Sequence, residues 1–424
     1  MIANQSNRRD FLKSFSLYTG GAMVAGIFPW STYLKAQTPG NNRIAKIGLI
    51  GFGSRGNLLF QVMKEAPGYE WAAICDIYEP HLDKARELTE NKIKYFKDYR
   101  KLLELQDLDA VIIATPLFEH YHQVMDALDA GKHVFCEKSM AMTPEQCKNM
   151  VMKQQETGKI LLIGHQRLFS PKYLRAMEMI HAGQIGSLTQ IRAFWHRNRD
   201  WRRPVPSPEL ERFINWRLYH EYSRGLMTEL ASHQIQVATW ALQEYPDEVM
   251  GSGSIVFWND GREVYDNVNL VYTFPSGVHL IYDSNTANKH YGLEEQIMGN
   301  TGTIEPELGK FFTEAPPPAP GILQLINQLE KDLFDNVPIG GASWVPDEPS
   351  KYQGEYLLEE EMKVDGTGLQ MRAFVEMVAN NDTSNIPFLL QEAYYASVAS
   401  LLGWEAMQSM KIIKWPEELK IKLV

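Results

Sequence analysis

A glycine motif near the start of the chain is the feature that most constrains its fold. The motif reads Gly51, Phe52, Gly53, Ser54, Arg55 and Gly56. It follows an apolar run, Ile47 to Ile50, that predicts a buried strand, and it opens a stretch that predicts a helix, Asn57 to Lys64. Gly51 permits a tight turn, Gly53 lets the backbone approach a pyrophosphate, and Gly56 lets helix and strand pack closely. Because the free N–H groups of such a helix favour negative charge, the motif predicts a dinucleotide-binding site.

An acidic residue at the end of the next strand indicates which dinucleotide is bound. The strand is predicted at Trp71 to Ile74, and Asp76 follows it about twenty residues after Gly56. A carboxylate there accepts hydrogen bonds from the adenosine ribose and repels a 2′-phosphate. We therefore predict NAD, rather than NADP, as the cofactor.

The first part of the chain alternates between predicted strands and helices. A continuous apolar run, Ala110 to Ala114, is typical of a parallel strand that is covered on both faces. A helix is predicted at His120 to Ala130, and the last strand of the series is predicted at Ile160 to Gly164. This alternation predicts an α/β fold, a Rossmann domain with a doubly wound parallel sheet over residues 43–165.

The pattern changes after residue 165. Helices are predicted at 171–181, 225–243, 368–379 and 391–410, and a proline-rich loop at 315–320. Strands are predicted at 188–195, 252–257, 267–274, 278–285, 294–299 and 303–305. Successive strands joined by short turns favour antiparallel pairing. Residues 166–424 are therefore predicted to form an α+β domain with a largely antiparallel open sheet, which serves substrate binding and oligomerisation.

Charge and cysteine content exclude several classes of function. The net charge of −10 argues against a general nucleic-acid or anionic-membrane surface. The three cysteines, Cys75, Cys136 and Cys147, form neither a disulfide framework nor a metal-binding pair, and no metal site is expected. The body of the chain contains no run that predicts a membrane span.

The N-terminus predicts export. Arg8 and Arg9 are followed by Phe11-Leu12-Lys13 and by a mildly apolar, glycine- and alanine-rich stretch. This pattern is typical of a twin-arginine signal, which we place at residues 1–36, and it predicts a periplasmic enzyme that binds its cofactor before export. No cysteine follows it, so a lipid anchor is not expected. The alternative is a frayed basic arm.

Several motifs in order give the chain a family resemblance. After the glycine motif come Val-Ile-Ile-Ala-Thr-Pro ending at Pro116, then His120, then Ala-Gly-Lys-His-Val-Phe-Cys-Glu-Lys ending at Lys138, and later Ser-His-Gln at 232–234. The chain resembles the glucose–fructose oxidoreductase/inositol dehydrogenase (Gfo/Idh/MocA) family. The resemblance implies hydride exchange between a sugar-like carbinol and a bound nicotinamide. It also implies a homo-oligomer, a dimer or tetramer, formed through the open sheet.

The resemblance implies a catalytic lysine. The family's Glu-Lys-Pro motif appears here as Glu137-Lys138-Ser139. Lys138 follows a predicted strand, where doubly wound folds hold their ligands, and a buried ammonium there stabilises a developing alkoxide. Ser139 replaces the family's proline, which is expected to loosen the turn without displacing Lys138. The alternative is a surface lysine that happens to follow a strand.

The family's second motif, an aspartate followed four residues later by histidine, appears here as Glu229 and His233. Positions i and i+4 share one helix face, so both side chains are expected to reach the same group. Imidazole is suited to proton transfer near neutral pH. Gln236 stands where the family often has another aspartate. The alternative is a core histidine with satisfied hydrogen bonds.

The remaining predicted site residues follow from the same resemblance. Thr115, Pro116, Glu137 and Lys138 are expected to bind the cofactor, His120 is expected near its nicotinamide end with Gln166 and Arg167 facing the same cleft, and Arg55 is expected near the pyrophosphate. Aromatic faces and forked arginine donors suit a sugar ring, and the predicted substrate contacts are Arg167, Trp201, Trp216 and Tyr219. A packed loop or an interface accounts for Trp201, Trp216 and Tyr219 equally well.

These observations predict an NAD-dependent oxidoreductase that acts on a carbohydrate or cyclic polyol. Lys138 and His233 would manage the hydroxyl proton, and which of them is the base stays open. The runner-up is an NAD-dependent glycosidase that oxidises C3 transiently, eliminates the aglycone and adds water. A non-catalytic sugar or nucleotide binder is a third hypothesis, and the combination of Lys138, Glu229 and His233 argues against it.

Overall fold

The computed structural model describes residues 43–314, 349–352, 354–357, 365–421 and 423. The predicted signal at residues 1–36 and the predicted proline-rich loop at 315–320 lie outside these ranges. Among the residues that the structure describes, none of the helices has both the length and the apolar character needed to span a bilayer.

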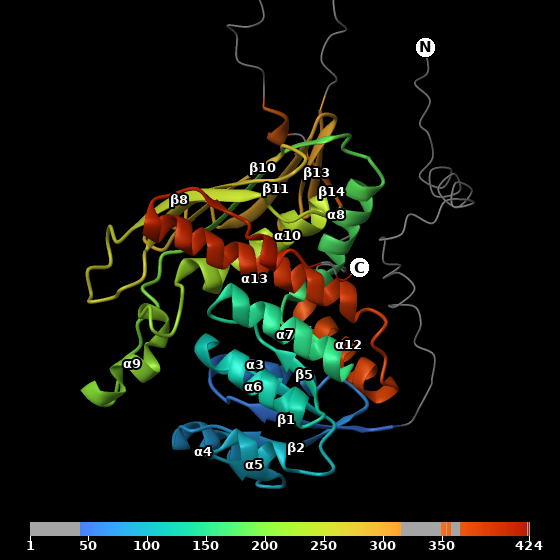
Figure 1. Cartoon of the computed structure of the whole chain (residues 1–424), viewed down its shortest axis with the longest axis vertical. Coiled ribbons are helices and arrows are strands. Elements are labelled where there is room, and N and C mark those ends of the chain that lie inside the picture. Colours follow the sequence, from blue (N-terminus) through green and yellow to red (C-terminus); the bar gives the residue numbers. More distant parts are fainter. Residues whose placement is uncertain (1–42, 315–348, 353, 358–364, 422, 424) are drawn as a thin grey trace, which may run out of the picture. The chain divides into compact units, whose positions relative to one another are not determined.

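The first sheet has six strands in the order β3-β2-β1-β4-β5-β6 (Figure 1). They are β1 (Ala45–Ile50), β2 (Tyr69–Cys75), β3 (Lys94–Phe96), β4 (Ala110–Ile113), β5 (His133–Cys136) and β6 (Leu161–Ile163). Every pair is parallel. The sheet reverses its strand order at β1, as a doubly wound Rossmann sheet does, and this part of the fold prediction is confirmed.

Helices cover both faces of this sheet, which is why β4 and β5 are buried along their whole length. They are α3 (Ser54–Met63), α4 (Glu79–Leu88), α5 (Tyr99–Leu103), α6 (Leu117–Asp129) and α7 (Pro144–Thr157). The hydroxyl of Thr143 caps α7 by accepting from the N–H of Gln146. Helix α6 begins at Leu117, three residues earlier than predicted, because Pro116 stands at its N-cap.

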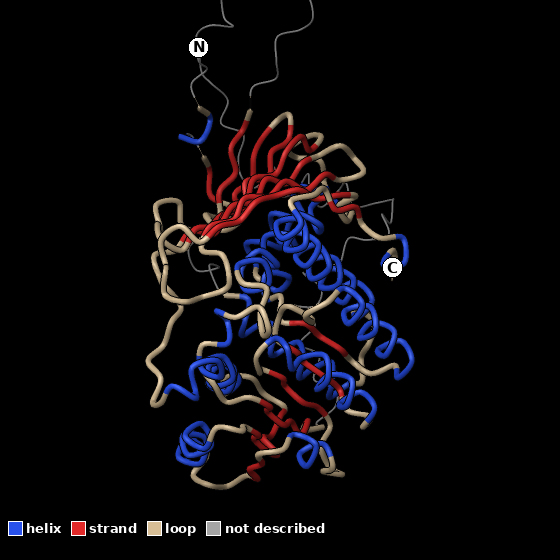
Figure 2. Tube along the Cα trace, turned by 60° about the vertical axis from the view of Figure 1, so that its left-hand side comes forward, coloured by secondary structure: helices blue, strands red, loops and turns tan. Residues whose placement is uncertain are grey.

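The second sheet has nine strands in the order β14-β13-β12-β11-β7-β10-β9-β8-β15. Figure 2 shows this sheet in red above a layer of helices. The strands are β7 (Leu188–His196), β8 (Glu248–Ser254), β9 (Asn267–Thr273), β10 (His279–Asn285), β11 (Leu293–Gly299), β12 (Gly302–Glu305), β13 (Lys310–Thr313), β14 (Glu355–Tyr356) and β15 (Ile413–Lys414). Strands β7 and β10 are parallel and the other pairs are antiparallel. The predicted second sheet, largely antiparallel, is confirmed.

One predicted strand is displaced. The prediction placed it at 252–257, but β8 ends at Ser254, and Val256 and Phe257 are exposed. The carboxylate of Asp266 accepts hydrogen bonds from the N–H groups of Val256, Phe257 and Trp258. Because those N–H groups bind a side chain, they are not free to continue the ladder.

Helices α8 (Pro171–His181), α10 (Ser232–Leu242) and α13 (Ile386–Ser409) pack against one face of the second sheet, and α13 also reaches the first. Helix α12 (Gly366–Asn380) packs on the Rossmann domain, against α3 and β1. On the sheet side, the hydroxyl of Tyr272 donates to the carbonyl of Ala399 in α13. On the Rossmann side, the amide of Gln370 in α12 donates to the carbonyl of Ile163. The closing helices therefore hold the two sheets together.

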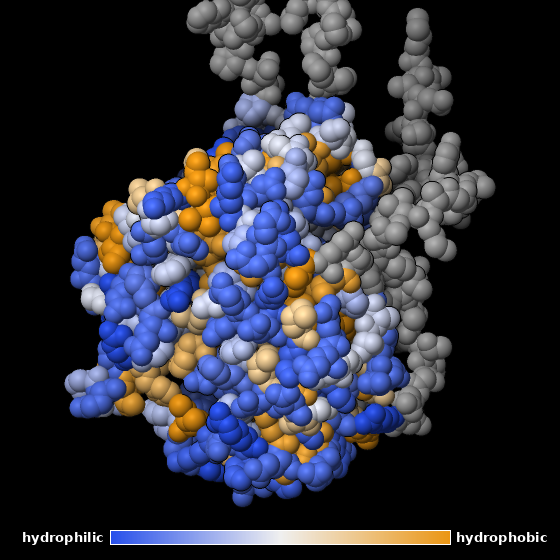
Figure 3. Space-filling view, viewed as in Figure 1, coloured by the Kyte–Doolittle hydropathy of each residue, from blue (hydrophilic) through white to orange (hydrophobic). Residues whose placement is uncertain are grey.

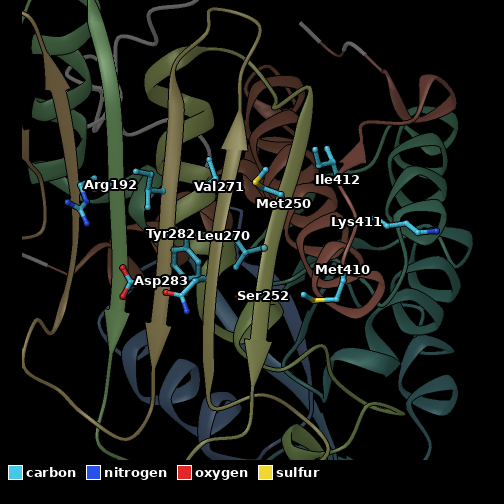
Figure 4. A pocket seen from close by; sticks show the side chains of 13 residues that line it. Arg192, Met250, Ser252, Leu270, Val271, Tyr282, Asp283, Met410, Lys411 and Ile412 are labelled. Carbon is cyan, nitrogen blue, oxygen red and sulfur yellow. The ribbon is translucent and has the colours of Figure 1, made fainter.

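The other face of the second sheet carries exposed side chains. A cavity of about 490 Å³ lies on it, lined by residues of β7 to β10 and by Met410 to Ile412 (Figure 4). Met250, Met410 and Ile412 are exposed there.

The surface seen in Figure 3 is mostly hydrophilic, with apolar residues gathered in patches.

Candidate active site

The glycine motif forms the turn between β1 and α3. Gly51 has a φ of +89°, and a side chain there would meet the carbonyl of Ala114 at 2.8 Å. A Cβ on Gly56 would lie 1.9 Å from the carbonyl oxygen of Gly51. In contrast, a Cβ on Gly53 would meet only the ring of His81, at 3.5 Å. Gly53 is thus open on the side where a pyrophosphate would approach, and α3 has no acidic residue in its first turn to oppose it.

Asp76 follows β2 and lies beside this turn. Its carboxylate accepts from the N–H of Phe52 at 2.7 Å and from the N–H of Tyr78 at 2.8 Å. The Nδ1 atom of His81 lies 3.0 Å from the same carboxylate. Asp76 thus holds the glycine turn, and its carboxylate lies at the end of β2. The open Gly53, the helix N-terminus and this carboxylate together fit a dinucleotide.

Removing the charge of Asp76 should change cofactor choice. We expect Asp76→Asn to raise the affinity for NADP relative to NAD about tenfold, because the amide keeps an acceptor for Phe52 but no longer repels a 2′-phosphate. Glu79→Gln is the control, since Glu79 pairs with Arg86 and Lys97 at the surface. Fluorescence titration with both dinucleotides measures the ratio, and an unchanged ratio in Asp76→Asn would contradict the assignment.

Arg55 links the glycine turn to the end of β5. Its Nε donates to Oε1 of Glu137 at 2.7 Å, which joins the first turn of α3 to that strand end. The predicted contact of Arg55 with a pyrophosphate stays a prediction. Glu137 in turn packs closely against Gly164, where a Cβ would lie 3.0 Å from its Oε2.

Lys138 joins the two domains at the centre of the site. Its Nζ donates to the carbonyl of Thr228 at 3.1 Å and to that of Glu229 at 2.8 Å. Both carbonyls belong to η4, a five-residue π-helical turn (Met227–Ala231) that precedes α10. A π turn leaves carbonyls out of the regular ladder, and such turns are frequent at functional sites. Burial lowers the pKa of Lys138, and the nearby charges of Glu229 and Glu137 oppose that shift.

The turn at Ser139 is not loose, contrary to expectation. Ser139 is buried, and its hydroxyl donates to the same Thr228 carbonyl at 3.0 Å. The Lys138–Ser139 peptide bond is cis. His120 lies beneath this turn, with Nδ1 2.8 Å from the carbonyl of Ser139 and Nε2 3.0 Å from the carbonyl of Thr115. Both ring nitrogens of His120 face the backbone, so it positions the turn that carries Lys138.

Glu229 is held by a cation on a neighbouring segment. The Nε of Arg217 donates to its Oε2 at 2.8 Å, and the guanidinium lies 4.2 Å from the ring centre of Trp216. Burial alone would raise the pKa of Glu229, but Arg217 and Lys138 bring it below its ordinary value. Glu229 is therefore ionised, and Trp216 lies next to the site through Arg217.

Two buried histidines meet beside Lys138. The rings of His233 and His165 are 5.8 Å apart and edge to face. Nδ1 of His233 and both nitrogens of His165 have no hydrogen-bond partner among the described residues. Burial, followed by the charge of Lys138, lowers the pKa of His233 well below its ordinary value and that of His165 to about 3. Both imidazoles are therefore neutral, with free nitrogens that can bind substrate hydroxyls.

The sequence analysis missed His165. It follows β6 as Glu137 follows β5, so the carboxyl edge of the sheet was the signal that could have identified it. Gln166, which was predicted, starts the short turn η1 (Gln166–Phe169), and its Oε1 is buried without a partner among the described residues. Thr115 and Pro116 lie at the end of β4, where the Thr115 hydroxyl donates to Gln123 at 2.9 Å.

Three of the predicted substrate residues are used in packing. Arg167 forms a buried ion pair with Glu295 of β11. Tyr219 is buried in a small cluster with Leu218 and Val264, and its hydroxyl donates to Glu211 at 2.7 Å. Trp201 packs against that cluster. For Trp201 and Tyr219 the packed-loop alternative agrees with the structure, because the Trp201 ring and the Tyr219 hydroxyl already have protein partners.

The segment that carries this cluster crosses from the second sheet to the Rossmann domain. It contains α9 (Glu211–Ile214), which extends from the body of the fold in Figure 1. The ring of Phe213 lies 6.0 Å from that of Tyr78, just after Asp76, and the ring of Tyr222 lies 4.8 Å from that of Phe118 in α6. Residues 201–224 thus contact the carboxyl edge of the Rossmann sheet at two points.

Within the described residues, no group of three His, Cys, Asp or Glu side chains is placed to hold a metal ion.

Two family models match the chain. The oxidoreductase family with an NAD-binding Rossmann fold, GFO_IDH_MocA, matches residues 45–165. The GFO/IDH/MocA C-terminal domain matches residues 173–305, and the two matches together span more than half of the chain. The chain belongs to the Gfo/Idh/MocA family. It is an NAD-binding oxidoreductase, which confirms the predicted family, enzyme class and cofactor.

Members of the Gfo/Idh/MocA family with known names are similar to the chain. Myo-inositol 2-dehydrogenase of Thermotoga maritima is 28% identical over 265 residues, 61% of this chain and 74% of that protein. A glycosyl hydrolase family 109 protein of Shewanella baltica is 29% identical over 346 residues, 70% of this chain and 73% of that protein. The structure of scyllo-inositol dehydrogenase from Lactobacillus casei, with NAD(H) and scyllo-inositol, matches 88% of this chain and 99% of that chain, with 20% identity and a TM-score of 0.64. The last comparison supports the fold.

Proposed function

We propose that this enzyme transfers a hydride between a hydroxyl-bearing carbon of a carbohydrate or cyclic polyol and bound NAD. The observation that carries the proposal is the arrangement around Lys138. A buried ammonium on two backbone carbonyls lies beside two neutral histidines with free nitrogens, at the same sheet edge as the glycine turn. The inositol dehydrogenases among the relatives support a polyol substrate.

Each residue of the site has its own role in the proposed reaction. His233 is neutral and takes the hydroxyl proton, while the ammonium of Lys138 stabilises the negative charge that develops on the same oxygen. NAD, when bound, supplies the nicotinamide that accepts the hydride. Glu229 and Arg217 hold the π turn whose carbonyls position Lys138. His165 binds a second hydroxyl through its free nitrogens.

The test is a substrate panel. Inositols, free aldoses and nitrophenyl glycosides are each incubated with the enzyme and NAD, and both NADH absorbance and free nitrophenol are recorded. NADH formation without nitrophenol release is the expected result. No NADH and no exchange of hydride with any sugar or polyol would overturn the proposal.

A second function is supported by one observation. The family 109 relative aligns over 346 residues, against 265 for the inositol dehydrogenase. In an NAD-dependent glycosidase the same hydroxyl oxidation occurs at C3, elimination releases the aglycone, and the hydride returns after water adds. Nitrophenol release without net NADH in the same panel would favour this function.

We propose that residues 1–36 direct export by the twin-arginine route and that the enzyme works in the periplasm. The paired Arg8 and Arg9 before the Phe-Leu-Lys sequence support this. Replacing both arginines by lysine should retain the full-length precursor in the cytoplasm, folded and loaded with cofactor. Fractionation followed by immunoblotting measures this, and normal periplasmic recovery of the variant would refute the signal.

We also propose that the open face of the second sheet forms a homo-oligomer interface. The cavity on this face and the exposed Met250, Met410 and Ile412 support it, because large apolar side chains gathered on one face favour association. Light scattering gives the mass in solution, and a monomer at micromolar concentration would refute this proposal.

A further inference from the structure

A basic cavity lies where β7 ends and the chain continues as an extended loop. Its volume is about 590 Å³, and it is lined by His196, Arg197, Asn198, Arg199 and Lys289. Two arginines and a lysine therefore line one hollow in a chain whose net charge is −10. Such a concentration of one sign in a cavity creates a local potential that attracts anions.

Among the described residues, the arginines and the lysine of this cavity have no acidic partner. Within the ranges that the structure describes, neither arginine nor Lys289 forms an ion pair, whereas His196 is paired with Asp283. Burial and then the charge of Arg199 lower the pKa of Arg197. The half-buried guanidinium of Arg197 lies next to another guanidinium, and no ion pair among the described residues balances its positive charge. An incoming anion would therefore gain most of its interaction energy there.

The arginines lie on the same side of the sheet as the catalytic cluster. The N–H of Arg197 donates to the carbonyl of Asn285 at 2.7 Å and that of Arg199 to Thr286 at 3.0 Å, so the chain stays extended. Side chains at alternate positions of an extended chain share a face, which places Arg197 with Trp195, and Arg199 is near enough for its charge to lower the pKa of Arg197. The guanidinium of Arg197 lies 4.5 Å from the ring centre of Trp195, and that ring lies 5.7 Å from His233.

We propose that this cavity binds a carboxylate, sulfate or phosphate group carried by the sugar substrate, so that the enzyme acts on acidic sugars. The inference rests on the proposed function, because it assigns the substrate class of the same site. The indole of Trp195 contacts both Arg197, at 4.5 Å, and the imidazole that takes the proton, at 5.7 Å, so the cavity lies one side chain away from that imidazole. Two guanidinium groups side by side offer forked donors that match the oxygens of such an anion.

The test compares matched acidic and neutral sugars. Glucuronate, glucose 6-sulfate and glucose 6-phosphate are each compared with glucose, and galacturonate with galactose, using the NAD-loaded enzyme. We expect kcat/KM to be at least about tenfold higher for the acidic member of the preferred pair, and the difference to shrink with added salt. Which anion gives the largest ratio identifies the group.

Two double variants distinguish an effect of the cavity from an effect of the overall charge of the protein. Arg197→Gln with Arg199→Gln should lower kcat/KM for the acidic sugar at least about tenfold and leave the neutral sugar within about twofold. Lys92→Gln with Lys101→Gln is the control, because it removes the same charge from two exposed surface pairs of the Rossmann domain. A loss of the same size in both double variants would overturn the inference.

Binding is measured separately through tryptophan fluorescence, since Arg197 contacts Trp195. Tight binding of acidic sugars without oxidation would keep this inference and overturn the proposed function. Oxidation of neutral sugars, with equal binding and equal kcat/KM for acidic and neutral members, would keep the proposed function and overturn this inference.

Discussion

Lys138→Ala is expected to lower kcat by a factor of about 10² to 10⁴ while leaving NAD affinity nearly unchanged. The ammonium interacts most strongly with an oxygen that carries developing negative charge, a state that exists only near the transition state. The loss should therefore appear in kcat and in kcat/KM together. Within the described residues, Lys138 donates its hydrogen bonds to Thr228 and Glu229 and not to the glycine turn or Asp76, so dinucleotide binding should persist.

Lys132→Ala is the matched control for this experiment. Lys132 is also a buried lysine, and its ammonium donates to two backbone carbonyls, those of Leu105 at 2.9 Å and Leu108 at 3.0 Å. It lies at the opposite end of β5 from Lys138, so its removal costs stability without touching the chemistry. Steady-state kinetics give kcat, and fluorescence quenching gives NAD affinity. If Lys138→Ala keeps more than about a tenth of the wild-type kcat, the lysine is not catalytic.

The pH dependence follows from the same contacts. Burial lowers the pKa of Lys138, so the protonated form needed for catalysis should be lost, as pH rises, below the value near 10.5 of an ordinary lysine. Lys138→Arg keeps the charge at all accessible pH values, and its residual activity should lack this alkaline decline. The pKa of His233 is also lowered, so the acid limb should fall below pH 6.5.

The local parts of this molecule are predictable from its sequence. The glycine motif and the apolar strands depend on residues that are neighbours in the chain, and both appear where the sequence places them. Boundaries shift where a distant side chain binds the backbone, as Asp266 does at the end of β8. Helix periodicity also does not reveal the π turn at Glu229, which lies inside the stretch 225–243 that the sequence predicts as one helix.

The contacts that assemble the site are the part that sequence does not reveal. Lys138 and Thr228 are 90 residues apart, and Arg55 and Glu137 are 82 apart. No local pattern specifies that these groups meet. Family resemblance names Lys138, Glu229 and His233, but it does not say that Glu229 pairs with Arg217 or that His165 faces His233. Arg167 shows the same limit. Its place in the sequence suggests a cation that binds a ligand, whereas in the fold it pairs with Glu295.

The second large effect is expected from that ion pair. Arg167 and Glu295 are almost completely buried, with side chains 7% and 0% exposed, and they join the loop after β6 to strand β11. The hydroxyl of Tyr173 lies 2.8 Å from the other oxygen of Glu295. Arg167→Met should lower the free energy of unfolding by about 3 to 5 kcal/mol, because it leaves the carboxylate of Glu295 buried without its cation.

Two further variants separate stability from substrate binding. Glu295→Gln added to Arg167→Met removes the uncompensated charge and should restore part of the lost stability. Arg175→Gln, which breaks an exposed pair with Glu178 on α8, should change the unfolding free energy by less than about 1 kcal/mol. Urea unfolding measures all three. A variant Arg167→Met with wild-type stability and a raised KM would show that the guanidinium binds substrate after all. The burial of both partners favours the opposite result, a destabilised protein whose folded fraction keeps its KM, because an arginine side chain that is only 7% exposed has little surface to offer a sugar.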